Sequence, residues 1–342
     1  MLLKRCGLII VLITVLALTM VGVFTSGTTS ISAEGSDPDW AIMNSNTTSH
    51  LRDVWGNSST DVFAVGLSGT ILHYDGSTWS GMTSPTNNNL WGVWGSNASD
   101  VFAVGDGGTI LHYNGSEWIK MNSNSSESLR GVWGTSGEEV FAVGDHLTIL
   151  HYNGSKWTQM NQDQNGSSLY DIVGTSSSDI FTVGCQTNIM HYDGSNWSTL
   201  GNQSDCIYGL WVNNSSDVFG VGWGGGFGYW NHSDINMIET GTSYNLYDVW
   251  GTAHDDVYMV GVAGNIEYYN GSACTKMETG STRHLYGIWG NDIGDIFVVG
   301  DNGTILRKVK PWTYVFYMAG DNNLEGWLTG YILAAMGGAI WC

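Results

Sequence analysis

The sequence is poor in charged residues, above all in basic ones. Only 12% of its 342 residues are charged, and 11 Lys and Arg stand against 31 Asp and Glu, so the formal net charge is −20. A nucleic-acid-binding protein needs clustered cations to displace the counterions of the phosphate backbone. No such cluster occurs along the chain, so the composition argues against a nucleic-acid partner.

Proline and cysteine are also scarce, with 3 and 5 residues, and no two cysteines form a CxxC pair that would indicate a metal or redox site. Cys185 and Cys206 could form a disulfide in an oxidising compartment, and two separate free thiols are the alternative. We expect neither a metal nor a cofactor.

The N-terminus carries a long apolar run. Lys4 and Arg5 precede an uncharged segment at 6–24, which has the layout of an export signal and is just long enough to cross a bilayer. We therefore expect a signal peptide or membrane anchor at 1–33 and a linker at 34–39. Because the two basic residues stay on the cytoplasmic side, the rest is expected to be secreted or held at the cell surface.

What dominates the sequence is a repeat of 38–40 residues. Seven copies share the pattern LxxVWG…DVFAVG…TILHY…W, and they begin at Leu51, Leu90, Leu129, Leu169, Ile207, Leu246 and Leu285. Each of the first six copies contains four short apolar segments, and in five of them an Asn-Gly or Asp-Gly pair, which suits a tight hairpin, separates the last two. Four strands in a repeat of about 40 residues predict one blade of a β-propeller.

The seventh copy ends after its third strand, and the missing strand is found ahead of the first copy. Residues 40–43, WAIM, have the Trp-x-x-Met spacing of the fourth strand in other copies. We predict that they complete the last blade and close the ring, which removes an exposed sheet edge. The predicted fold is all-β: a seven-bladed propeller of four-stranded antiparallel blades at 40–309, expected to be a monomer.

Residues that recur among the copies are interpreted as scaffold. The histidine of the LHY segment, present in four copies, lies too far from its neighbours in other blades for a shared metal ion, so packing is the favoured role. The acid before the second strand is interpreted as a turn residue that accepts bonds from backbone amides, with calcium binding as the alternative. The tryptophans of VWG are expected to pack between blades.

One position varies among residue types that are common at binding sites. It directly follows the first residue of each copy, where seven inner strands should converge at one mouth of the central channel. Aromatic and Arg side chains there would anchor a protein or glycan, with packing between blades as the alternative. The candidates are Arg52, Trp91, Arg130, Tyr170, Tyr208, Tyr247 and Tyr286.

No catalytic set was identified. Glu267 and the pair Asp145-His146 interrupt the repeat, but nothing in the sequence brings them together, so a propeller glycoside hydrolase is the second alternative function. The glycine-rich stretch GWGGGFG of copy five lies in a hairpin and not before a helix, so it is a poor phosphate loop.

Residues 312–325, WTYVFYMAGDNNLE, resemble the opening strand of clostripain-like cysteine peptidases. That family's catalytic His and Cys lie far downstream, so no catalytic residue is carried over, and 310–342 would be a truncated peptidase start with an apolar tail. The VWG…DVFAVG repeats resemble exported bacterial and archaeal propellers and, more distantly, photosystem II assembly-factor propellers. Together these resemblances imply an extracytoplasmic, non-catalytic propeller, the accessory region of a secreted protease-like protein. A truncated clostripain-like peptidase is the first alternative.

Overall fold

The computed structural model describes residues 40–160, 166–186, 189–200, 205–231, 234–291 and 294–308. All of them lie in the second of the chain's two units, residues 37–342. The predicted signal or anchor, the linker and the peptidase-like segment lie outside the described residues. Within the described ranges, no helix has the length and apolar character needed to cross a membrane.

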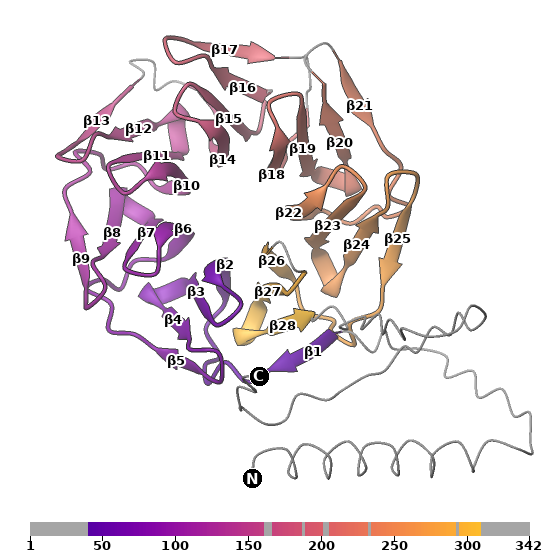
Figure 1. Cartoon of the computed structure of the whole chain (residues 1–342), viewed down its shortest axis with the longest axis horizontal. Helices are drawn as coiled ribbons and strands as arrows, with labels where there is room; N and C mark the ends of the chain where they lie inside the picture. Colours follow the sequence, from indigo (N-terminus) through magenta and orange to yellow (C-terminus); the bar gives the residue numbers. More distant parts are fainter. Residues whose placement is uncertain are drawn as a thin grey trace, which may run out of the picture. The chain divides into compact units, whose positions relative to one another are not determined.

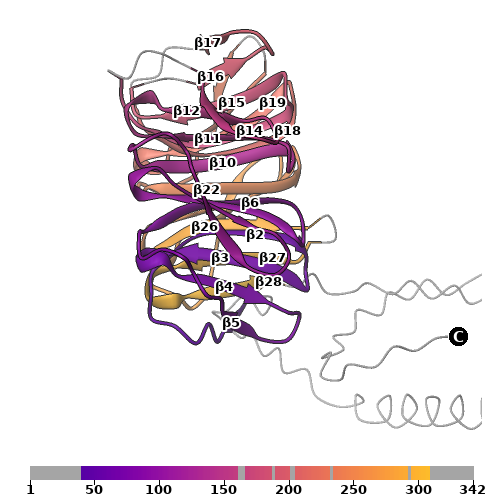
Figure 2. The same cartoon turned by 90° about the vertical axis from the view of Figure 1, so that its left-hand side faces the viewer.

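Seven four-stranded sheets surround a common axis and form a seven-bladed β-propeller, which confirms the predicted fold (Figure 1). All strand pairs are antiparallel, as between β2 and β3. The inner strands run across the thickness of the ring (Figure 2), so residues near the start of each strand lie at one face. These inner strands, from blade one to blade seven, are β2 (Leu51–Ser58), β6 (Leu90–Asn97), β10 (Leu129–Ser136), β14 (Leu169–Ser176), β18 (Ile207–Asn214), β22 (Leu246–Ala253) and β26 (Leu285–Gly290).

The other strands follow in order outward from the axis. The second strands are β3 (Asp61–Gly66), β7 (Asp100–Gly105), β11 (Glu139–Gly144), β15 (Asp179–Gly184), β19 (Asp217–Gly222), β23 (Asp256–Gly261) and β27 (Ile296–Gly300). The third strands are β4 (Ile71–Tyr74), β8 (Thr109–Tyr113), β12 (Ile149–Tyr152), β16 (Ile189–Tyr192), β20 (Phe227–Trp230), β24 (Ile266–Tyr269) and β28 (Ile305–Lys308). The outer strands are β5 (Trp79–Gly81), β9 (Trp118–Met121), β13 (Trp157–Gln159), β17 (Trp197–Leu200), β21 (Ile235–Met237), β25 (Cys274–Met277) and, for blade seven, β1 (Trp40–Met43).

A short 3₁₀ turn joins the second strand to the third in six blades. The middle residue of each turn has a positive φ and is Gly in two turns and Ser, His, Ala or Asn in the others. The residue that follows it also has a positive φ and is Gly in five of the six turns. The turns are η1 (Leu67–Gly69), η2 (Asp106–Gly108), η3 (Asp145–Leu147), η4 (Trp223–Gly225), η5 (Val262–Gly264) and η6 (Asp301–Gly303).

The core consists of apolar layers between neighbouring blades. Phe63 and Ile71 of blade one, for example, pack with Leu90, Val101 and Leu111 of blade two. Both faces of a blade are covered in this way, which explains why the second and third strands are apolar at nearly every position.

A tryptophan and a glycine interlock at most blade boundaries, because the indole of each VWG segment covers the glycine of the next one. A Cβ on Gly95 would come within 2.7 Å of the Trp55 indole, which leaves no room for a side chain. Trp94 covers Gly134 in the same way. Blades four and five depart from this pattern together. Val173 replaces the tryptophan, Val212 replaces the glycine that it would cover, and the two valines share one cluster.

The N-terminal strand closes the ring as predicted. β1 pairs antiparallel with β28, with Trp40 opposite Lys308 and Met43 opposite Ile305. Met43 packs on the core shared with blade one, while Trp40 packs on the core shared with blade six. The first and last described strands therefore lie side by side in one sheet (Figure 1).

The recurring acids have a different partner from the one predicted. In most blades they pair with side chains of the third strand rather than acting chiefly on turn amides, whereas Asp217 contacts Asn213 and His254. Asp61 and His73 are 2.7 Å apart, and the same pair recurs in three further blades at 2.7–2.9 Å, as Asp100–His112, Glu139–His151 and Asp179–His191. Each of these His rings also packs on the Phe of the second strand, with centroids 4.5–4.6 Å apart, so the histidine is a packing residue.

Candidate functional site

The seven predicted anchor residues lie together at one face of the ring. Each is the second residue of an inner strand and is partly buried. Because the inner strands surround the axis, these side chains meet around its end. We call this set the mouth ring: Arg52, Trp91, Arg130, Tyr170, Tyr208, Tyr247 and Tyr286.

Four tyrosines from blades four to seven form one continuous side of the mouth ring, which we call the tyrosine arc. Ring centroids are 5.5 Å apart between Tyr170 and Tyr208, 5.7 Å between Tyr208 and Tyr247, and 5.1 Å between Tyr247 and Tyr286. Burial raises the pKa of Tyr208, Tyr247 and Tyr286, so these phenols remain neutral at physiological pH.

Two arginines and a tryptophan form the other side. The guanidinium carbon of Arg52 lies 4.0 Å from the ring centroid of Tyr286 and 5.2 Å from that of Trp91. The guanidinium carbon of Arg130 lies 4.8 Å from the ring centroid of Trp91. Ring contacts therefore run without a break from Tyr170 through blade seven to Arg130.

Residues of the 3₁₀ turns fix these side chains from outside. The Trp91 indole N–H donates to Asp106 Oδ1 at 2.6 Å, and Arg130 donates two bonds to Asp145, at 3.1 and 3.0 Å. Burial opposes ionisation of Asp145, but the bonds from Arg130 prevail and hold its pKa below the ordinary value. Asp301 accepts from His50 at 2.5 Å. Arg130 thus has its own acid, and Asp106 and Asp301 lie on the same side of the mouth ring.

Three carboxylates lie directly below the mouth ring, and the sequence reasoning missed them. Asp53, Asp171 and Asp248, the axial carboxylates, each follow a mouth-ring residue and accept two backbone N–H bonds, one from the next residue and one from the next blade. Burial raises the pKa of Asp53 to about 7 and of Asp171 to about 6. Burial and the charges of the other two raise the pKa of Asp248 well above its ordinary value.

The signal for these acids was visible in the sequence. Copies one, four and six carry Asp where the other copies carry Gly, as in LRDVWG against LWGVWG. The glycines allow close approach of inner strands: a Cβ on Gly131 would stand 3.0 Å from Asp171 Cα. The backbone N–H of Leu210 donates a hydrogen bond to Asp171, so the acid joins blade four to blade five. This contact depends on how the blades are arranged in the ring and cannot be read from the sequence.

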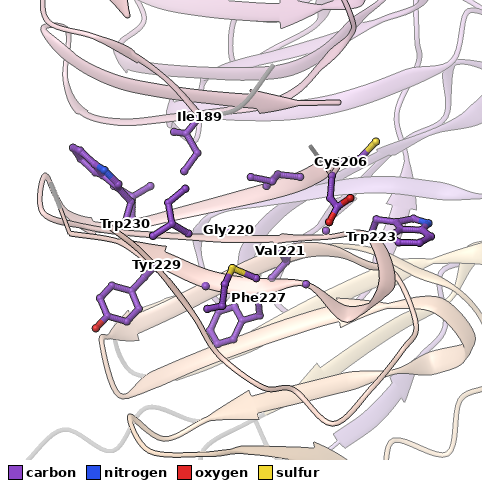
Figure 3. Close-up of a pocket in the computed structure, with 16 residues that line it drawn as sticks. Ile189, Cys206, Gly220, Val221, Trp223, Phe227, Tyr229 and Trp230 are labelled. Atoms are coloured by element: carbon purple, nitrogen blue, oxygen red, sulfur yellow. The ribbon is translucent and has the colours of Figure 1, made fainter. Parts of the chain in front are cut away.

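A separate pocket lies between blades four and five. Its volume is about 70 Å³, and its lining is mainly apolar, with Ile189, Val221 and Trp230 among the walls (Figure 3). It exists because Gly220 and Gly228, paired across two strands, replace the buried Ala–Leu pair of blades one to three. Blade five also exposes Trp223, whose side chain is 60% accessible.

The structure does not assemble a catalytic centre from the residues that break the repeat. Glu267 is 2% exposed in β24 of blade six, whereas Asp145 and His146 lie in η3 of blade three and bind Arg130 and Glu127. Among the described residues, no group of three or more His, Cys, Asp or Glu could hold a metal. Cys185 and Cys206 are joined by a disulfide beside the tyrosine arc, with the Tyr170 hydroxyl 3.6 Å from the Cys185 sulfur.

Comparison with known proteins supports the fold alone. No protein-family model and no curated protein matches the sequence. Among solved structures, the chain is similar to YCF48 bound to a D1 peptide, with a TM-score of 0.68 and 16% identity over 80% of this chain and 97% of that one. The WD40 propeller domain of Doa1 gives a TM-score of 0.65 and 15% identity over 79% and 95% of the two chains. The RRP9 WD40 repeats give 0.69 and 8% identity over 81% and 99%. All of these solved structures are β-propellers or propeller-like repeats by fold, as this chain is.

Proposed function

We propose that this chain is an extracytoplasmic, non-catalytic binding propeller that holds a protein segment at the mouth ring. The observation that carries the proposal is the mouth ring itself, in which five aromatic and two Arg side chains from seven blades form one contiguous set of contacts. Tyr, Trp and Arg are the residues that most often dominate binding energies at protein interfaces.

A protein ligand is favoured over a glycan by one comparison. YCF48, which shares the propeller fold, was solved bound to a D1 peptide, and its likeness to this chain makes a peptide the first ligand class to test. An extracytoplasmic location is supported by the N-terminal apolar run and by the Cys185–Cys206 disulfide, because disulfides persist in oxidising compartments. The resemblance of 312–325 to clostripain-like peptidases supports a role as the accessory region of a secreted protease-like protein.

A peptide selection tests the proposal directly. The full chain would be immobilised and panned against a random dodecapeptide phage library, and enriched peptides would be synthesised and titrated. We expect the double substitution Trp91→Ala and Tyr247→Ala to weaken their binding by about 30-fold or more, as for other interface hot spots.

The matched control is Ile119→Ala, which removes an exposed side chain from β9 in blade two, away from the mouth ring. It should leave the affinities unchanged. If the enriched peptides bind the double variant as tightly as the unaltered chain, the mouth ring is not the binding site and the proposal is wrong. Binding of the chain to sugars on a glycan array, together with no enrichment of any peptide from the library, would contradict a protein ligand.

A further inference from the structure

We propose that the segment held at the mouth ring inserts a lysine or arginine side chain into the tyrosine arc. This inference rests on the proposed function and names the feature of the partner that the site recognises. It is carried by the aromatic geometry of blades four to seven and by the distribution of charge along the chain.

The tyrosine arc has the composition of an aromatic site for an organic cation. Its four rings are contiguous, and their planes meet at 60°, 49° and 35° rather than stacking face to face. All four tyrosines are only partly buried, so their rings remain accessible from the face of the propeller. Ring faces attract Lys and Arg cations through the aromatic quadrupole, most strongly where water is partly excluded.

The blades that supply the arc contain almost no basic residues of their own. Between Lys156 and Lys276 the sequence has no Lys or Arg and twelve Asp and Glu. This stretch includes blades four and five and most of blade six, from which Tyr170, Tyr208 and Tyr247 come. Several of these acids, such as Asp179 and Asp256, pair with the far end of the inner strands and not with the end that carries the tyrosines. Their charge therefore acts on an approaching cation over a distance and favours its encounter with these blades.

Acids also accompany the arc on its own strands. Asp171 and Asp248 directly follow Tyr170 and Tyr247 in the inner strands and accept backbone N–H bonds there, although their burial, which raises their pKa, limits the negative charge that they place below the rings. Asp205, at the start of the chain segment that leads into Tyr208, is exposed. All three are on the arc side of the ring.

The arginine side does not offer an equivalent site for an acidic segment. Arg130 already holds Asp145 through two hydrogen bonds, and Asp106 and Asp301 lie beside Trp91 and His50. Three acids thus accompany two arginines on that side. That side therefore has no excess of positive charge to attract an acidic segment. On the arc, Arg52 lies over Tyr286 at one end, and the rings of Tyr170 and Tyr208 come from blades without Lys or Arg.

The test compares two synthetic peptide mixtures on the immobilised full chain at physiological salt. Both are nonapeptides, acetylated and amidated at their ends, with randomised neutral residues around a central position. That position is lysine in one mixture and norleucine, which has a similar length without the charge, in the other. We expect the lysine mixture to be retained about tenfold more strongly, the range of a partly desolvated cation–π contact.

Three variants assign the preference to the arc. Tyr208→Ala should abolish the preference for lysine, whereas Tyr208→Phe, which keeps the aromatic face, should retain most of it. Trp91→Ala should weaken retention of both mixtures by the same factor, because Trp91 lies on the other side of the mouth ring. Circular dichroism of each variant verifies the fold, and the Phe variant shows that a loss on Tyr208→Ala does not come from unfolding.

The outcomes separate this inference from the proposed function. Equal retention of the two mixtures, or a lysine preference that survives Tyr208→Ala, overturns the inference and leaves the mouth ring as a peptide site. If neither mixture is retained, and no phage-selected peptide depends on Trp91 and Tyr247, the proposed function itself is wrong.

Discussion

Single residues that depart from the repeat show what each position requires. Glu267 stands where blades one to three and seven place a buried Leu, and the residue is only 2% exposed. Desolvation raises its pKa, since burial penalises the charged form, and one of its oxygens has no hydrogen-bond partner among the described residues. The sequence revealed the substitution but not its burial, because a Glu at this position could equally well have pointed out of the blade.

We predict that Glu267→Leu stabilises the protein, and more so at pH 8 than at pH 4. A carboxyl whose pKa is raised in the folded state binds its proton more tightly there than in the unfolded chain, so its contribution to stability falls as pH rises between the two pKa values. We expect a gain of about 1–2 kcal/mol at pH 8 from removing a poorly satisfied buried polar group. Urea denaturation at both pH values measures it.

The control for this prediction is Glu239→Gln, because Glu239 is exposed and its replacement should change the free energy of unfolding by less than about 0.5 kcal/mol. A gain from Glu267→Leu that is equal at both pH values would show that the carboxyl is not the cause.

Neighbouring blades pack through complementary contacts that cannot be read from any single copy of the repeat. The sequence predicted that the VWG tryptophans pack between blades, but not that each covers the glycine of the next blade. That relation depends on the angle between blades, as do the bonds of Asp53, Asp171 and Asp248 to the next inner strand. Strand order and turns follow from local patterns, whereas contacts between blades follow from the ring.

At the boundary of blades four and five, we predict that two destabilising substitutions compensate each other. Val173→Trp overfills the space beside Val212 and should cost about 1–3 kcal/mol. Val212→Gly leaves a cavity and a flexible strand residue, at a similar cost of about 1–3 kcal/mol. The double variant recreates the Trp–Gly contact of the other blades. It should be at least about 1 kcal/mol more stable than the sum of the two single-substitution losses predicts.

A double-mutant cycle measured by chemical denaturation gives the coupling energy between these two positions. If the two losses of stability are additive, the spacing between blades four and five differs from the spacing between the other neighbouring blades, and a Trp–Gly contact no longer fits there.

For the whole molecule, closure of the ring depends on a strand of four residues. The sequence predicted this strand and its partner correctly, since the Trp-x-x-Met spacing of WAIM matched the outer strands of other blades. The mouth-ring positions were predicted as well, because a repeat places equivalent residues around one axis. The cation preference that we propose for the arc could not be predicted in this way, because the proposal depends on ring contacts between blades and on which blades lack basic residues.

We predict that Trp40→Ala combined with Met43→Ala lowers the melting temperature by about 5–10 °C, because both side chains anchor β1 to the cores on either side of blade seven. Ile42→Ala is the matched control, since this side chain of the same strand is 71% exposed and should have little effect. Equal melting temperatures for the double variant and the unaltered chain would show that β1 is not needed for closure. Differential scanning calorimetry provides the measurement.

The register of β1 on β28 also determines how this protein would respond to mechanical tension. Trp40 lies opposite Lys308, so a pull exerted on the chain before Trp40 and after Lys308 acts at the same end of the two strands. In this geometry the interstrand hydrogen bonds bear the load one after another, as in a zipper, and not all at once as in shear. Blade seven is therefore the part of the propeller that should open at the lowest force. Stretching would detach β1 first and open the ring at blade seven, while the six blades that are each formed by one continuous segment of the chain stay folded.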